Sequence, residues 1–231
     1  MVEHTVKAFD QDIDTLRGLI AEMGGRAEAS LDNAMMALLR RDKNMARQVV
    51  LDDPKIDALE EQVERLVVQT IALRAPMAND LREVVAALKI AGVVERIGDY
   101  GKNIAKRVPL IVENRKLELM SLLPSMGQIA GEMVHDALNA FAARDADLAI
   151  AVIERDKVVD DFYNSIFRTL LTYMAENPKM ISESAHLLFV AKNIERIGDH
   201  ATNVAEMVYY AATGQYLPDR ERGEAPEDAG K

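Results

Sequence analysis

An eleven-residue segment occurs twice in this sequence, and this repeat constrains the fold more than any other feature. ERIGDYGKNIA begins at Glu95 and ERIGDHATNVA begins at Glu195, and seven of the eleven positions are identical. Self-similarity at a fixed distance is typical of chains built from repeated structural units. The sequence therefore predicts two copies of one unit, each about 100 residues long.

Apolar residues recur at steps of three and four, which is the spacing of the buried face of an α-helix. The clearest series begins at Ile56, and a similar series begins 103 residues later at Val159. The two series are Ile56, Leu59, Val63, Leu66, Thr70 and Leu73, and Val159, Phe162, Ile166, Thr169 and Tyr173. No segment is rich in the β-branched and aromatic residues that favour strands. The sequence therefore predicts an all-α fold.

Turn-forming segments divide the chain into helices. Arg40–Asp42 and Ala143–Asp145 have the composition of tight connections, Pro76 and Pro178 mark two further turns, and Pro109 with the polar residues 113–118 separates the halves. The predicted helices are 6–40, 42–75, 78–108, 119–143, 145–176 and 180–212. Short connections make neighbouring helices antiparallel. We therefore expect two tandemly repeated antiparallel three-helix bundles, residues 1–114 and 115–216, followed by a disordered tail, residues 217–231.

Composition excludes several classes of function. The chain has no Cys, which excludes disulfides, thiolate metal sites and a cysteine nucleophile. Its net charge of −10 argues against nucleic acid as the main partner. No secretory signal and no apolar stretch long enough for a membrane span are visible, so a cytoplasmic location is expected. Phosphate-binding loops, zinc-protease motifs and nucleophile elbows are also absent, which favours a non-enzymatic role.

Acidic residues form two pairs in each half. Asp53 and Asp57 on the second predicted helix lie as far from Pro76 as Asp99 and Glu95 on the third. In an antiparallel hairpin, residues at equal distances from the turn lie level, so the four carboxylates are expected within about 6 Å by 8–10 Å. The second half repeats this arrangement around residues 177–178, with Asp156, Asp160, Glu195 and Asp199.

Each acidic group is expected to bind cations. Four carboxylates at close range repel one another unless they are protonated, paired with basic groups or bound to metal. All-oxygen ligands suit Mg²⁺, Ca²⁺, Mn²⁺ or iron better than structural zinc, and more than one ion would fit. Asn103 and Asn203 could add contacts, while Gly98 and Gly198 allow a neighbour to approach. The alternative is a solvated acidic face neutralised by Arg96 and Arg196.

Other candidate ligands stay open. Folding the first helix of each half back onto the others places Glu28 level with the first group, and Glu132, His135 and Asp136 level with the second. The E-x-x-H pairs Glu132/His135 and Glu183/His186 are similar to those of carboxylate-bridged di-iron proteins. These pairs lie at levels that differ by about 15 Å or more, so one centre cannot use both. Ordinary surface histidines account better for these pairs, and the mismatch weighs against the alternative to a non-enzymatic role, which is a metalloenzyme such as a diiron-type oxidase or a metal-dependent hydrolase. A purely structural scaffold is the third interpretation.

The sequence resembles the PhoU family of accessory proteins of bacterial phosphate-specific transport. The resemblance rests on HTVKAFDQDIDTLRGLIAEMGG, LDDPKID, NDLREVVAALKIAGVVERIGD, ERDKVVDDFY and FVAKNIERIGDHATNVAEMVYYAATG. It implies two three-helix repeats with an E(D)-x-x-x-D motif on their helices. It also implies that the acids of this motif bind multinuclear iron or other divalent or trivalent metal ions, with manganese, magnesium and zinc as candidates. Those acids are Asp53, Asp57, Glu95, Asp99, Asp156, Asp160, Glu195 and Asp199.

The same resemblance implies a regulatory role. Proteins of this family are thought to link the ATPase subunit of the phosphate-specific ABC transporter to a phosphate-sensing histidine kinase. When phosphate is plentiful, they repress the starvation response and restrain phosphate uptake. They are cytoplasmic, reach the membrane only through partners, and often form homodimers. The resemblance therefore implies a metal-binding adaptor that is a negative regulator of phosphate homeostasis.

Overall fold

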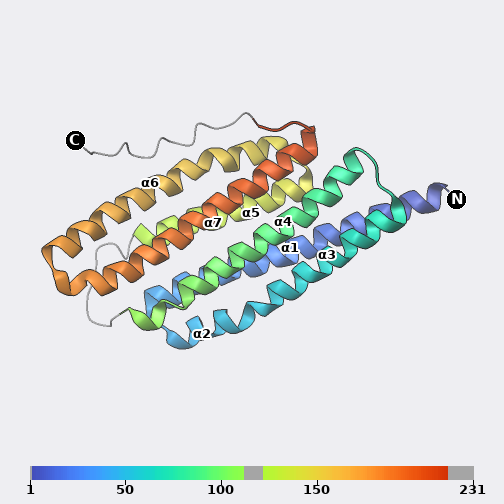
Figure 1. The fold of residues 1–231 in the computed structure, drawn as a ribbon. Helices are drawn as coiled ribbons and strands as arrows, with labels where there is room; N and C mark the ends of the chain where they lie inside the picture. The colour runs from blue at the N-terminus through green and yellow to red at the C-terminus, as the bar shows by residue number, and fades with distance from the viewer. Residues whose placement is uncertain (1, 112–121, 218–231) are drawn as a thin grey trace.

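The computed structural model describes residues 2–111 and 122–217, and its long helices confirm the predicted all-α fold (Figure 1). The residues expected to separate the halves, 113–118, and all but the first residue of the predicted tail lie outside this range. The helices are α1 (Val2–Arg40), α2 (Lys43–Asp52), α3 (Pro54–Arg74), α4 (Asn79–Ala105), α5 (Leu122–Ala143), α6 (Ala146–Glu176) and α7 (Ile181–Thr213), with short 3₁₀ turns at Val108–Leu110 and Pro178–Met180.

The first connection of each repeat is built in the same way. Arg41 and Arg144 adopt left-handed backbone conformations, with φ of 55° and 54°, and end α1 and α5. The next residue, Asp42 or Asp145, caps the following helix, because its carboxylate accepts hydrogen bonds from two backbone N–H groups of the first turn. Both tight connections predicted from the sequence are confirmed.

The second predicted helix, 42–75, is interrupted. It forms α2 and α3 with a break at Asp53, because Pro54 has no backbone N–H and its ring crowds the carbonyl of the preceding turn. The corresponding helix of the second repeat contains no proline, and α6 runs without a break from Ala146 to Glu176. The two repeats therefore differ in shape at the residue that begins the first acidic group.

The buried face of α3 drifts from the predicted one toward its end. Ile56 and Val63 are buried as expected, whereas Val67 is buried in place of its neighbour Leu66, and Leu73 is 62% exposed. The prediction assumed 3.5 residues per turn, but a straight α-helix has 3.6, so a seven-residue repeat moves around the helix by about 20° per heptad. The same drift buries Leu170 in α6.

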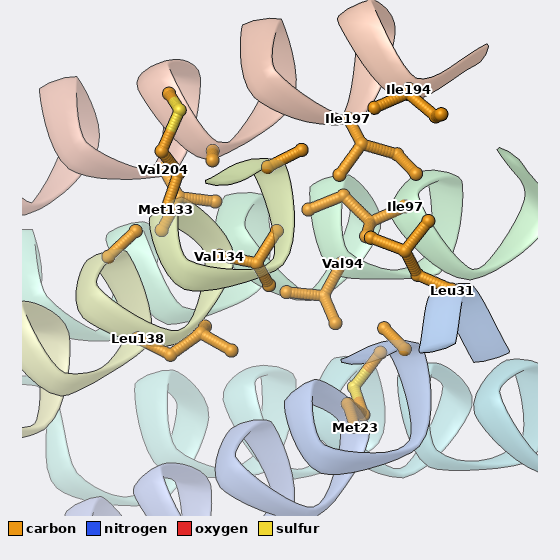
Figure 2. Packing of buried hydrophobic residues seen from close by; sticks show 14 of the residues in the cluster. Met23, Leu31, Val94, Ile97, Met133, Val134, Leu138, Ile194, Ile197 and Val204 are labelled. Carbon is orange, nitrogen blue, oxygen red and sulfur yellow. The ribbon is translucent and has the colours of Figure 1, made fainter. Parts of the chain in front are cut away.

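The two repeats share one hydrophobic core. Figure 1 shows α4 and α7 side by side in the middle of the molecule, and α1 packs against α5. Figure 2 shows side chains of all four helices meeting, with Met23 and Val94 from the first repeat opposite Met133 and Ile197 from the second. Helices α3 and α6 pack on the outside of these four helices, each against its own repeat, and add buried side chains to the same core. Helix by helix, none of the segments that the structure describes carries an apolar stretch sufficient to span a lipid bilayer.

Candidate metal centre

The first acidic group lies where α3 packs against α4. Asp53 stands at the break before α3 and its side chain is only 7% exposed, whereas Asp57, one turn later, is exposed. Glu95 and Asp99 face them from α4 and are half-buried. The helices approach closely here, because a Cβ on Gly98 would lie 2.6 Å from the Cδ1 of Ile56. Gly98 thus makes room for a side chain of α3.

A lysine bridges two acids of the first group. The Nζ of Lys102 lies 2.5 Å from Oδ2 of Asp53 and also contacts Oδ1 of Asp99. These two aspartates come from different helices, and the sequence predicted that they would lie level. The structure therefore brings Asp53 and Asp99 to one ammonium group.

Two carboxylates of the first group, those of Glu95 and Asp57, resist ionisation. Burial and the nearby Asp99, Glu60 and Asp57 raise the pKa of Glu95 to about 7. Burial, followed by the charge of Asp53, also raises the pKa of Asp57, although Lys102 opposes this shift. Burial and neighbouring negative charges make the ionised carboxylates costly, and a bound cation would offset that cost.

The second acidic group lies between α6 and α7. Asp156 is half-buried, and its Oδ1 lies 3.4 Å from the position that a Cβ on Gly198 would take. Burial, followed by the charge of Glu195, raises the pKa of Asp160, so these two predicted partners interact electrostatically. Asp199 is exposed on α7.

Glu195 is a mostly buried acid of the second group. Its side chain is 12% exposed, and Oε1 accepts a contact from Nζ of Lys192, three residues earlier on α7. Its Oε2 is fully buried and has no hydrogen-bond partner. A buried carboxylate oxygen without a partner is costly, and a bound cation would compensate for that cost.

The acids do not form a ready coordination sphere. Among the residues that the structure describes, no three Asp, Glu or His side chains are grouped so that they could hold one ion. The donor chemistry fits a hard cation, because all eight acids of the two groups are carboxylates and Glu195 presents an unsatisfied oxygen. Metal binding therefore stays a prediction at all eight positions.

The basic residues that contact these acids differ from those that the sequence predicts. Arg96 and Arg196 are the predicted neutralising residues, whereas Lys102 and Lys192 make the contacts. Lys102 lies three residues after Asp99 on α4, a spacing that places both side chains on one helix face and could have revealed it. Glu60, one turn after Asp57, was missed in the same way.

The candidate third-helix ligands have other contacts. Glu28 of α1 lies 3.3 Å from Nδ1 of His135 on α5, a contact between the two repeats. Asp136 pairs with Arg155 of α6 at 2.8 Å, and Glu132 accepts a hydrogen bond from Gln128. In the second E-x-x-H pair, Glu183 is buried at the start of α7, whereas His186 is partly exposed.

Equivalent positions of the two repeats meet between the acidic groups. Tyr100 of α4 stacks on His200 of α7 with ring centroids 5.3 Å apart, and the Tyr100 hydroxyl lies 3.1 Å from Nε2 of His200. Asn203, a candidate extra ligand, lies 3.3 Å from Nδ1 of the same histidine. Burial, Arg96 and Arg196 lower the pKa of His200.

The elevated pKa of Glu95 gives a testable pH dependence. In the unfolded chain this group has a pKa near 4.5, so ionisation disfavours the folded state increasingly between pH 4.5 and about 7. In chelator-treated protein, Glu95→Gln is therefore expected to raise the melting temperature relative to wild type at pH 8, and by much less at pH 5. Glu206 is exposed on α7, so the control Glu206→Gln should change the melting temperature little at either pH. A gain for Glu95→Gln that is equal at both pH values would contradict the assignment.

Comparisons with known proteins agree with this architecture. The family model described as the PhoU domain matches residues 20–108 and 123–208. A curated relative from Zymomonas mobilis, a phosphate-specific transport system accessory protein PhoU homolog, is 53% identical over 222 residues, which are 96% of this chain and 94% of the relative. The homolog of the same description from Caulobacter vibrioides is 44% identical over 94% of this chain and 95% of its own length.

Solved structures show the same fold. The crystal structure of PhoU from Pseudomonas aeruginosa has a TM-score of 0.86 and 36% identity, covering 90% of this chain and 100% of that one. The phosphate transport system regulatory protein PhoU from Streptococcus pneumoniae has a TM-score of 0.85 and 27% identity, covering 91% and 99%. Two matched segments of the family model, relatives aligned over nearly their whole length and a shared fold lead to one conclusion: the chain belongs to the PhoU family.

Proposed function

We propose that this protein is an accessory protein of phosphate-specific transport that represses the phosphate starvation response and restrains phosphate uptake. The observation that carries the proposal is the identity of more than half of the residues, over nearly the whole chain, with the Zymomonas mobilis accessory protein. It acts in the cytoplasm as an adaptor between the ATPase subunit of the phosphate ABC transporter and a phosphate-sensing histidine kinase. It reaches the membrane only through these partners, and it works as a homodimer.

Metal ions bound to the two acidic groups are part of this proposal. Asp53, Asp57, Glu95 and Asp99 would hold one or more ions between α3 and α4. Asp156, Asp160, Glu195 and Asp199 would do so between α6 and α7. Iron, manganese, magnesium and zinc are the candidates. The ions would supply positive charge that offsets the carboxylates and fixes each outer helix against the core.

The role proposed is not enzymatic. A carboxylate with a pKa near 7, such as Glu95, has the acidity of a general acid or base, and this favours a metalloenzyme as the alternative. Turnover of O₂ or of a phosphoester by the metal-loaded protein, lost in Glu95→Gln, would support the enzyme. Metal retention without turnover supports the adaptor.

A genetic experiment tests the regulatory role. Deletion of the gene is expected to activate a phosphate-starvation reporter in phosphate-rich medium, and wild-type protein should restore repression. A variant with Asp57→Asn, Glu95→Gln, Asp160→Asn and Glu195→Gln should restore it poorly. A charge-matched control replaces four exposed acids outside the groups by the corresponding amides: Glu61, Glu64, Glu154 and Glu206. An unchanged reporter after deletion would refute the proposal.

A binding experiment tests the partners. Purified protein immobilised at physiological salt should retain the ATPase subunit of the phosphate ABC transporter and not that of an unrelated ABC transporter. Failure to retain it, with either metal-loaded or metal-free protein, would argue against the adaptor role even if repression is confirmed.

A further inference from the structure

Lys102 joins two of the four acids of the first acidic group. It lies in the last turn of α4, and its ammonium group contacts Asp53, at the start of α3, and Asp99, one turn back on its own helix. The Lys102 side chain is 21% exposed and that of Asp53 is 7% exposed, so both charges are largely removed from water. An ammonium group between two carboxylates of different helices stands where a shared metal ion would be expected.

The electrostatics favour a permanent positive charge there. Partial burial alone lowers the pKa of Lys102, but hydrogen bonds to Asp53 and Asp99 outweigh burial and raise the pKa above its usual range. Because its ammonium group contacts both carboxylates, the Lys102 side chain fills the space between Asp53 and Asp99. A metal ion could bind Asp53 and Asp99 together only after the lysine side chain has swung away.

The second repeat lacks this lysine. The position equivalent to Lys102 is Thr202, which carries no charge and is buried. The lysine near the second group, Lys192, comes from the opposite side of the motif and contacts Glu195 instead. The residue equivalent to Lys192 in the first repeat is Gly92. The two acidic groups therefore have similar acids but different built-in cations.

We propose that Lys102 is the built-in cation of the first acidic group and competes with metal ions for Asp53 and Asp99. The competition rests on the proposed metal binding, whereas the role as counterion does not. The first group therefore binds a divalent ion more weakly than its four carboxylates alone would, and it releases its lysine when the ion enters. Metal loading would therefore displace a lysine side chain of α4, and the second repeat has Thr202 at the equivalent position.

The competition is tested by titrating metal into a chain in which only the first acidic group is intact. Asp160→Asn and Glu195→Gln together disable the second group, and binding of Mn²⁺ to chelator-stripped protein is followed by electron paramagnetic resonance of the free ion. Adding Lys102→Met should tighten binding at least about tenfold, because a buried positive charge beside the site is removed. Lys106→Met, at an exposed position four residues later, should leave the affinity unchanged. Equal affinities with and without Lys102 would overturn the competition.

Urea unfolding in EDTA tests the counterion role without any metal. Lys102→Met and Lys102→Thr should each lower the unfolding midpoint, and adding Asp53→Asn and Asp99→Asn to either variant should restore much of the loss. A midpoint equal to that of wild type would overturn the proposal even if Mn²⁺ binds. If neither wild type nor any variant binds Mn²⁺ while the midpoints shift as expected, metal binding fails and the counterion stands. A Lys102→Met chain that is unfolded in EDTA should regain its helical circular dichroism with the two Asp→Asn changes, and its failure to do so would count against the proposal.

Discussion

Replacing Gly101 by Val is expected to lower the free energy of unfolding by about 3 kcal/mol, the upper end of what overpacking costs. Gly101 is buried in α4 where this helix crosses α1. A Cβ there would lie 2.4 Å from Oγ of Ser30 and 3.1 Å from the backbone N of Leu31. The serine side chain can rotate, but the backbone of α1 cannot move without disturbing the shared core.

A second glycine provides the matched control. Gly25 lies in the interior of α1 with no atom within 4 Å of its would-be Cβ, so Gly25→Ala should stabilise the protein by about 0.5–1 kcal/mol. Urea unfolding followed by circular dichroism measures both changes. A Gly101→Val protein as stable as wild type would show that α1 and α4 do not approach closely at this crossing.

Glu83→Gln is expected to cost about 3 kcal/mol, because it leaves two arginines facing a neutral amide in a mostly buried site. The Glu83 carboxylate on α4 accepts from Nη2 of Arg17 on α1 at 2.6 Å. It also contacts Arg144, which lies in the left-handed turn between α5 and α6. The side chain of Glu83 is only 6% exposed. This carboxylate therefore joins both repeats at one end of the bundle.

A double-mutant cycle isolates the part of this effect that crosses between repeats. Combining Glu83→Gln with Arg144→Met should give a coupling free energy of about 1 kcal/mol or more, because the removed partners touch. The exposed pair Glu22 and Arg26 on α1 is the control, and Glu22→Gln should cost less than about 1 kcal/mol. A coupling near zero for Glu83 and Arg144 would mean that the contact contributes nothing to joining the repeats.

Local features of the fold were predictable because they depend on short segments. The Asp caps at positions 42 and 145 follow from hydrogen bonding within one turn, so the sequence identified both connections. The drift of the buried face from Leu66 to Val67 was not predicted, because a regular pattern of apolar residues does not reveal whether the helix keeps 3.5 or 3.6 residues per turn. The break at Asp53 could have been predicted from Pro54, which the helix assignment overlooked.

The arrangement of the repeats was less predictable, because helical periodicity reveals a buried face without naming its partner. Met23 and Met133 were recognisable as apolar residues of helices, but nothing in their spacing shows that α1 packs against α5. The positions of the acids depended only on equal distances from a turn, so their levels were predictable. The position of Lys102 depends on its side chain reaching across to α3, which no periodic pattern encodes.

The contact between Tyr100 and His200 has a consequence for the origin of the chain. It joins equivalent residues of the two repeats, and contact between equivalent residues is what a two-fold rotation axis produces. A single-repeat ancestor that paired with itself would have placed the same residue on both sides of that axis. Fusion of two copies into one gene lifts this restriction. One position can then supply a phenol and the other an imidazole, a complementary pair that a symmetric dimer of identical chains could not make on its axis.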